Sequence, residues 1–92
     1  MRKNRTNIQI KIDILKCIAS RKNGIAKNRL MLKSNTCSTI LQKYLDELLY
    51  RGFANEIQTG TNIPYKRISI TLEGKEYLYN LEKLNNLDKY ET

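Results

Sequence analysis

The fold of this chain is decided by residues 30–70, LMLKSNTCSTILQKYLDELLYRGFANEIQTGTNIPYKRISI. A short helical stretch ends before the polar residues 34–36, which form a turn, and an amphipathic helix then covers residues 37–51. Its apolar face holds Leu41, Tyr44, Leu45, Leu48 and Leu49. Residues 53–59 and 65–70 alternate as strands on either side of a glycine-containing loop. This order predicts a helix-turn-helix followed by a β-hairpin, or wing.

Upstream of this stretch, residues 7–20 can be interpreted in two ways. Isoleucines at every second position from Ile8 to Ile14 are typical of a strand, but Leu15, Ile18 and Ala19 break the alternation. On a helix, Ile8, Ile12, Leu15 and Ala19 share one face, so we expect a helix capped by Thr6 or Asn7. Its apolar arc is wide, because Ile10 and Ile14 extend beyond that face, which suggests contact with a second subunit. Residues 25–26 can form a short strand and residues 27–33 a helix.

Downstream, Thr71 can cap a last helix that runs to about Asp88. Tyr77, Leu81 and Leu84 are spaced four and three residues apart, as in a short heptad seam. The seam predicts pairing between two copies of the chain. The residues expected at this dimer interface are Tyr77, Leu78, Leu81, Leu84, Ile10 and Ile14.

Together these segments predict one mainly helical α+β domain, a winged helix-turn-helix with a long C-terminal helix. Residues 1–6, with Arg2, Lys3 and Arg5, form a basic N-terminal arm. Residues 7–71 form the winged domain, and residues 72–92 the dimerisation helix. The chain has 92 residues, enough for one modest core that would gain from a face shared with a second copy.

The charge balance narrows the function classes. Lys and Arg number 17 against 9 Asp and Glu, which gives a formal net charge of +8. This excess suits a phosphate backbone, and also an anionic membrane surface. No apolar run is long enough to span a bilayer, and no uninterrupted apolar stretch follows the basic N-terminus, so neither a spanning helix nor a signal peptide is expected.

Catalysis and metal binding are not expected. The chain has no histidine, the commonest general base, and its acidic residues form no spaced pair that suggests a pocket. Cys17 and Cys37 alone cannot complete a zinc site of the usual type, so they are expected to be thiols in a reducing cytosol, with a disulfide as the alternative. We expect no cofactor, no metal and no small-molecule ligand.

The candidate DNA-contacting residues lie on the polar side of the helix over residues 37–51. Gln42 can bond adenine bidentately, Lys43 can reach guanine or phosphate, and Ser38 and Thr39 offer hydroxyls. The alternative is an ordinary solvated face, which any amphipathic helix possesses.

Cations around this helix complete the candidate site. Lys66 and Arg67 follow the hairpin loop, where they could contact DNA backbone or minor groove, or instead protect a sheet edge. Arg5 in the arm has the same two interpretations, a minor-groove contact or a solubilising charge. The remaining candidate DNA contacts are Lys27, Arg29 and Asn35.

Three segments carry a resemblance to a known family. Residues 41–53, LQKYLDELLYRGF, resemble the recognition-helix-to-strand segment of small archaeal winged-helix proteins, and residues 68–78, ISITLEGKEYL, resemble their junction between second strand and last helix. Residues 26–33, AKNRLMLK, are similar to their first helix-turn-helix helix. Cys37 departs from the pattern, because serine is the more usual cap at that position.

The resemblance implies a winged helix-turn-helix domain that dimerises through its C-terminal helix, often as an antiparallel coiled coil. Such proteins are DNA-binding regulators or nucleoid-type proteins of archaea, and similar ones occur in archaeal viruses. By position, DNA-facing residues would fall on Ser38, Thr39, Gln42 and Lys43, with wing contacts near Lys66 and Arg67.

The sequence thus predicts a homodimeric regulator that binds specific double-stranded DNA. Residues 37–51 would enter the major groove and the wing, residues 59–67, would contact flanking DNA. We expect it in the cytoplasm, associated with the nucleoid, or in the host cytoplasm if viral. The alternatives are an architectural protein with little sequence preference, a protein-interaction module and, more distantly, a membrane-surface protein.

Overall fold

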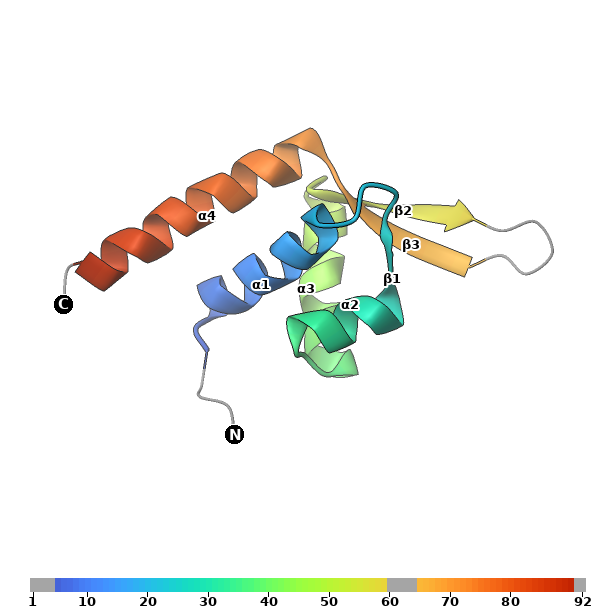
Figure 1. Cartoon of the computed structure of the whole chain (residues 1–92), viewed down its shortest axis with the longest axis horizontal. Helices are drawn as coiled ribbons and strands as arrows, with labels where there is room; N and C mark the ends of the chain where they lie inside the picture. Colours follow the sequence, from blue (N-terminus) through green and yellow to red (C-terminus); the bar gives the residue numbers. More distant parts are fainter. Residues whose placement is uncertain (1–4, 60–64, 91–92) are drawn as a thin grey trace.

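Four helices pack beside a small three-stranded sheet in the computed structural model, which describes residues 5–59 and 65–90 (Figure 1). The elements in chain order are α1 (Asn7–Ala19), β1 (Ile25–Ala26), α2 (Lys27–Ser34), α3 (Ser38–Tyr50), β2 (Ala54–Thr59), β3 (Tyr65–Ile70) and α4 (Leu72–Tyr90). The mainly helical winged helix-turn-helix fold with a long last helix is therefore confirmed. The predicted loop residues 60–64 and arm residues 1–4 lie outside the described part of the chain.

Capping residues fix where the helices begin and end. The Thr6 hydroxyl accepts a hydrogen bond from the Gln9 amide at 3.0 Å and starts α1. The Thr71 hydroxyl does the same for the Gly74 amide at 2.9 Å, and so starts α4 as predicted. Gly52 follows α3 with φ of +79°, the left-handed conformation that glycine adopts without strain.

The sheet places β3 in its centre, between β1 and β2, and both pairings are antiparallel. Ile68 faces Ile25 of β1 on one side and Glu56 of β2 on the other. The β2–β3 hairpin extends away from the helices as the wing (Figure 1). One apolar core joins sheet and helices. Its members include Ile12, Ile14, Leu15, Ile18, Ile25, Leu30, Leu41, Tyr44, Leu45, Leu48, Ala54, Ile68 and Leu81.

Helix α4 leaves the sheet and runs back along α1 in the opposite direction (Figure 1). Its first two turns lie against Phe53, in the segment between α3 and β2. The Tyr77 ring stacks on Phe53 with 4.2 Å between centroids. A Cβ atom on Gly74 would lie 2.0 Å from the Phe53 carbonyl oxygen, so only glycine fits at this position. The first turn of α4 is thereby fixed to the rest of the domain.

The predicted dimer residues are largely used within the single chain. Ile14 is completely buried and Leu81 is 8% exposed, so both belong to the core rather than to a free surface. Ile10, Tyr77 and Leu78 are half-buried against that core. Leu84 is 49% exposed and is the one residue of the predicted set that the described chain leaves substantially uncovered. Within one chain, the core thus already covers Ile14 and Leu81, and a dimer interface through α4 stays a prediction.

Candidate nucleic-acid interface

Helix α3 has two sharply different faces. Leu41, Leu45 and Leu48 are buried in the core, and Tyr44 is buried with its hydroxyl donating to Asn7 Oδ1 at 2.8 Å. On the opposite side, the side chains of Ser38, Thr39, Lys43 and Asp46 are exposed. The polar side of α3 is thus open to solvent, as required of a helix that enters a DNA groove.

Gln42 lies at the centre of a hydrogen-bonded trio on this outer face. Its Oε1 accepts a hydrogen bond from Lys27 Nζ, at the start of α2, and its Nε2 donates to Asp46 Oδ1 at 2.7 Å. Both ends of the amide are therefore engaged in the free protein. The contact also joins the first residue of α2 to α3, so Lys27 and Gln42, both predicted DNA contacts, form one continuous surface.

The first turn of α3 begins with two polar residues, Ser38 and Thr39, and has no side-chain cap. Cys37 occupies the N-cap position and makes no side-chain hydrogen bond to the helix, so the departure from serine has a structural consequence. Asn35 is exposed in the preceding turn, with φ of +61°. Among the described residues no pair of cysteines is bonded, since Cys17 and Cys37 are both free thiols. No cluster of metal-ligating side chains occurs in the same part of the chain.

The two predicted wing cations differ in their surroundings. Lys66 is exposed, and its Nζ lies 3.9 Å from Glu56 Oε1 on the neighbouring strand. Arg67 is half-buried in the middle of the sheet, where it is aligned with Ala26 of β1 and Ile57 of β2 and donates to the Gly24 carbonyl at 3.5 Å. Lys66 therefore belongs to the wing surface, whereas Arg67 lies nearer the base of the hairpin.

Arg5 does not extend freely from the domain. Its Nη1 lies 2.6 Å from Asp13 Oδ2 and donates to the Ser34 carbonyl at 3.0 Å, while Nη2 donates to the Asn35 carbonyl at 2.6 Å. The guanidinium thus ties α1 to the turn between α2 and α3. This bracing by Arg5 escaped the sequence interpretation, and the groove contact of Arg5 stays a prediction.

A second polar cluster, also missed from the sequence, supports α3 from behind. Lys11 Nζ donates to Glu47 Oε2 at 3.0 Å, and Arg51 Nη1 reaches the same oxygen at 3.1 Å. The hydrogen bond from Lys11 lowers the pKa of Glu47 below its usual value. Burial lowers the pKa of Lys11, but its bonds to Glu47 and Tyr77 outweigh this and raise the pKa overall. Both charges are thereby stabilised where α1, α3 and α4 meet.

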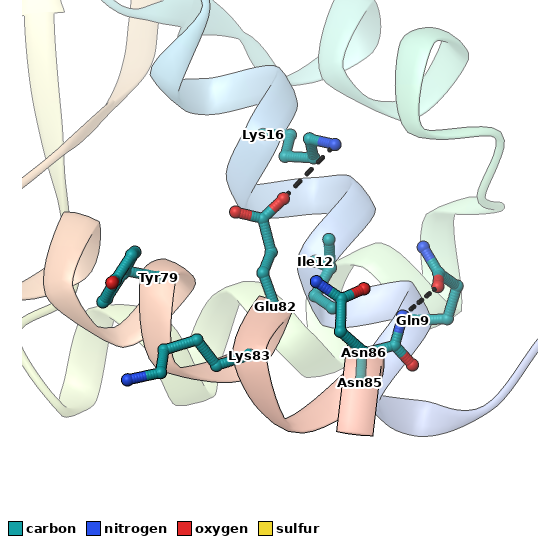
Figure 2. Close-up of a pocket in the computed structure, with 8 residues that line it drawn as sticks. All are labelled: Gln9, Ile12, Lys16, Tyr79, Glu82, Lys83, Asn85 and Asn86. Carbon is teal, nitrogen blue, oxygen red and sulfur yellow. Dashed lines mark hydrogen bonds and ion pairs between the residues drawn. The ribbon is translucent and has the colours of Figure 1, made fainter. Parts of the chain in front are cut away.

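Away from this interface, a cavity of about 370 Å³ lies between α1 and α4 (Figure 2). Lys16 Nζ lies 3.3 Å from Glu82 Oε2 across it, and Asn85 Nδ2 donates to Gln9 Oε1 at 3.1 Å. These polar groups satisfy one another across the two helices. The polar contacts across this cavity therefore hold α4 against α1.

Among the described residues, no helix has both the length and the hydrophobicity to cross a membrane.

Comparison with known proteins places this arrangement in a family. The family model described as winged helix-turn-helix matches residues 4–89, nearly the whole chain. The chain belongs to the winged helix-turn-helix family. No curated protein sequence matches it significantly.

Solved structures show the same fold. Sso10a-2, a DNA-binding protein from Sulfolobus solfataricus, aligns with a TM-score of 0.74 and 24% identity over 94% of this chain and 84% of its own. F-93 of the archaeal virus SSV1 aligns over the full length of both chains, with a TM-score of 0.62 and 22% identity. A Listeria innocua protein of unknown function aligns with a TM-score of 0.62 and 16% identity over 80% of this chain and 50% of its own. The resemblance to small archaeal winged-helix proteins is thereby confirmed.

Proposed function

We propose that this protein binds double-stranded DNA in a sequence-dependent way and acts as a transcriptional regulator without catalysis. The observation that carries the proposal is the outer face of α3, where Ser38, Thr39 and Lys43 are exposed opposite a fully buried apolar face. In this proposal α3 lies in the major groove and Lys66 on the wing contacts flanking backbone. It would act wherever the DNA lies, in the cytoplasm of a cell or of an infected host.

Unpaired positive charge on α2 and α3 supports the assignment. Lys27, Arg29 and Lys43 are exposed, and within the described residues none of them has a carboxylate at ion-pair distance. Unpaired surface cations are available to displace counterions from a phosphate backbone. Sso10a-2, which shares the fold, is described as DNA-binding, and this agrees with the proposal.

We further propose that two copies associate through the distal half of α4. The seam of Tyr77, Leu81 and Leu84 begins in the intrachain core and ends at Leu84, which is 49% exposed. A second copy would cover the part of the seam that the first copy leaves open. Leu84→Lys should then convert a dimer into a monomer in sedimentation equilibrium, while Lys75→Glu, an exposed change near the start of α4, should leave it a dimer.

Selection of binding sites from random duplex DNA, repeated at two salt concentrations, tests the function directly. A regulator should bind its selected site on the order of 10³-fold more tightly than scrambled duplex at matched salt. Gln42→Ala with Lys43→Ala should reduce that preference, whereas Lys66→Ala should weaken binding to all sequences and lower the salt slope by about 1. Lys75→Ala serves as the charge-matched control. Parent-like binding by all these variants would show that the assigned surface is wrong.

Two other functions predict different results in the same experiment. An architectural DNA-binding protein would bind selected and scrambled duplexes equally, in keeping with a surface whose readout amide, Gln42, is already occupied. A protein-interaction module would show negligible affinity for either duplex at physiological salt.

A further inference from the structure

One cavity outside the predicted contacts is lined by three arginines. Arg21 comes from the turn after α1, Arg29 from the first turn of α2 and Arg67 from the central strand β3. Ile25 and Ala26 of β1 complete the lining, and the volume is about 220 Å³. The turn after α1, the start of α2 and the central strand β3 thus each place an arginine at one small recess.

The electrostatics of this recess favour an anion. Arg21 and Arg29 are exposed, and neither makes an ion pair within the described residues. Arginine stays protonated in proteins, so Arg21 and Arg29 bring two positive charges to the recess with no carboxylate of the described residues at ion-pair distance. The first turn of α2 adds to the positive field, because it contains no acidic residue and its N-cap, Ala26, has no side-chain cap.

Chemistry and size point to a phosphate group. Guanidinium groups present forked donors that match the oxygens of a phosphate. The cavity is smaller than the roughly 300–1,000 Å³ of sites that hold drug-sized ligands. A single phosphate therefore suits the recess better than a nucleotide or another small organic effector.

The position of the recess indicates where that phosphate comes from. Ala26 in its lining directly precedes Lys27, which contacts Gln42 on the outer face of α3. Arg67 lies on β3, the strand that returns from the wing. The recess therefore includes the residue next to Lys27, which bonds to α3, and a residue of the wing strand β3. Under the proposed function, the backbone beside the occupied groove would pass there.

We propose that Arg21, Arg29 and Arg67 together bind one backbone phosphate of the duplex and so set the register of α3 in the groove. This inference rests on the proposed DNA-binding function. It adds Arg21 to the interface, and it assigns Arg29 and Arg67 to a shared phosphate rather than to separate contacts.

Titration with inorganic phosphate tests the recess without DNA. In the full chain, the Nε–Hε NMR signals of the three arginines should shift together and saturate as phosphate is added at constant ionic strength, with chloride as the balancing anion. The same signals should not move in this way when chloride alone is varied. Absence of a saturable shift in these arginines would overturn the proposal.

Duplexes with single neutral methylphosphonate linkages then identify the source of the phosphate. At one linkage beside the selected site, the parent should lose roughly tenfold in affinity, whereas Arg21→Gln with Arg29→Gln should start roughly tenfold or more weaker and lose little further at that linkage. The double variant should also lower the salt slope by about 1. Lys22→Gln with Lys75→Gln removes the same charge, and Lys22 neighbours Arg21 without lining the cavity, so this control should respond like the parent.

The remaining outcomes separate this inference from the proposed function. If the double variant still loses tenfold at the same linkage, another group binds that phosphate and the inference is wrong. If the parent binds no duplex while the arginine signals still saturate with phosphate, the proposed function fails and the recess is a site for a free phosphate anion. If the parent binds duplex but no single linkage matters, the recess does not bind backbone.

Discussion

Two groups of cations in this domain are used in opposite ways. The inner cations, Arg5 and Lys11, have side chains only 19% and 20% exposed, and each is bound to a carboxylate, Asp13 at 2.6 Å and Glu47 at 3.0 Å. The outer cations, such as Arg21 after α1, Arg29 on α2 and Lys43 on α3, are exposed and have no ion pair within the described chain. Only some of the positive charges of the protein are therefore free to interact with another molecule. The inner cations hold the helices in place, and the outer ones remain for a polyanion.

This difference predicts that inner and outer substitutions separate two measurements. Inner changes should lower the free energy of unfolding and leave the salt slope of DNA binding unchanged. Outer changes should lower affinity and the salt slope, with stability within about 0.5 kcal/mol of the parent.

The largest expected effect is at Gly74, at the root of α4. Gly74→Ala would place a Cβ 2.0 Å from the Phe53 carbonyl oxygen and 2.8 Å from Ile70 Cγ1, so the helix must shift. We expect a loss of about 3 kcal/mol in the free energy of unfolding, measured by urea denaturation. Gly52→Ala is the control. It meets open space but has φ of +79°, so its cost should be about 1 kcal/mol. Equal losses would show that α4 is not held by this close contact.

Arg5→Ala tests the bracing of the α2–α3 turn. The change removes the ion pair to Asp13 and two hydrogen bonds to turn carbonyls. We expect about 2 kcal/mol of destabilisation with no change in salt slope. Arg21→Ala, which changes an outer arginine, should lower the salt slope and leave the free energy of unfolding close to that of the parent. If Arg5→Ala unfolds at the same urea concentration as the parent but has a lower salt slope of DNA binding, Arg5 contacts DNA and does not brace the turn.

Glu47→Gln tests the cluster behind α3 through its pH dependence. The folded pKa of Glu47 is lowered by its bonds to Lys11 and Arg51, so the charged form stabilises the fold above its unfolded pKa. That stabilisation is lost as the pH falls through the lower folded pKa. At pH 7 we expect a deficit of about 1 kcal/mol relative to the parent, discounted because the cluster is partly exposed. The deficit should shrink below about pH 4. Glu56→Gln is the exposed control, and a deficit constant to pH 3 would contradict the assignment.

The smallest expected effect is a gain at the first turn of α3. Cys37→Ser places a hydroxyl at an N-cap where the native side chain makes no cap bond. We expect a stabilisation of about 0.5–1 kcal/mol by urea denaturation. Cys17→Ser, within the body of α1, is the comparison and should not stabilise. No gain for Cys37→Ser would mean that the backbone at this cap does not admit the hydroxyl bond.

The local architecture was predictable because each element is set by its own periodicity and caps. The apolar face of α3, the cap at Thr71 and the glycine after α3 were all readable from neighbouring residues. The position of α4 was not, because Gly74 looks like a poor capping choice until the Phe53 carbonyl is seen beside it. A close approach between two segments requires a glycine, but the sequence does not identify the segment that approaches it.

The sequence predicted which residues of the candidate site are exposed, but it predicted the roles of the cations less well. Ser38, Thr39 and Lys43 are exposed as periodicity required. Arg5, however, bonds carbonyls 29 and 30 residues away, and no local pattern encodes a partner at that separation. The seam of α4 meets the same limit, since one apolar face can pack in a core or against a second copy, and Leu81 packs in the core. Sequence periodicity identifies the face but not what covers it.

The occupied amide of Gln42 bears on how strictly a target would be read. A readout side chain usually discriminates because a mismatched base leaves its polar atoms orphaned in a dry interface. The amide of Gln42 has alternative hydrogen-bond partners, because Lys27 and Asp46 bond to it when no adenine is present. A wrong base pair opposite Gln42 therefore carries a reduced penalty, and this position of an operator would tolerate variation that the others do not.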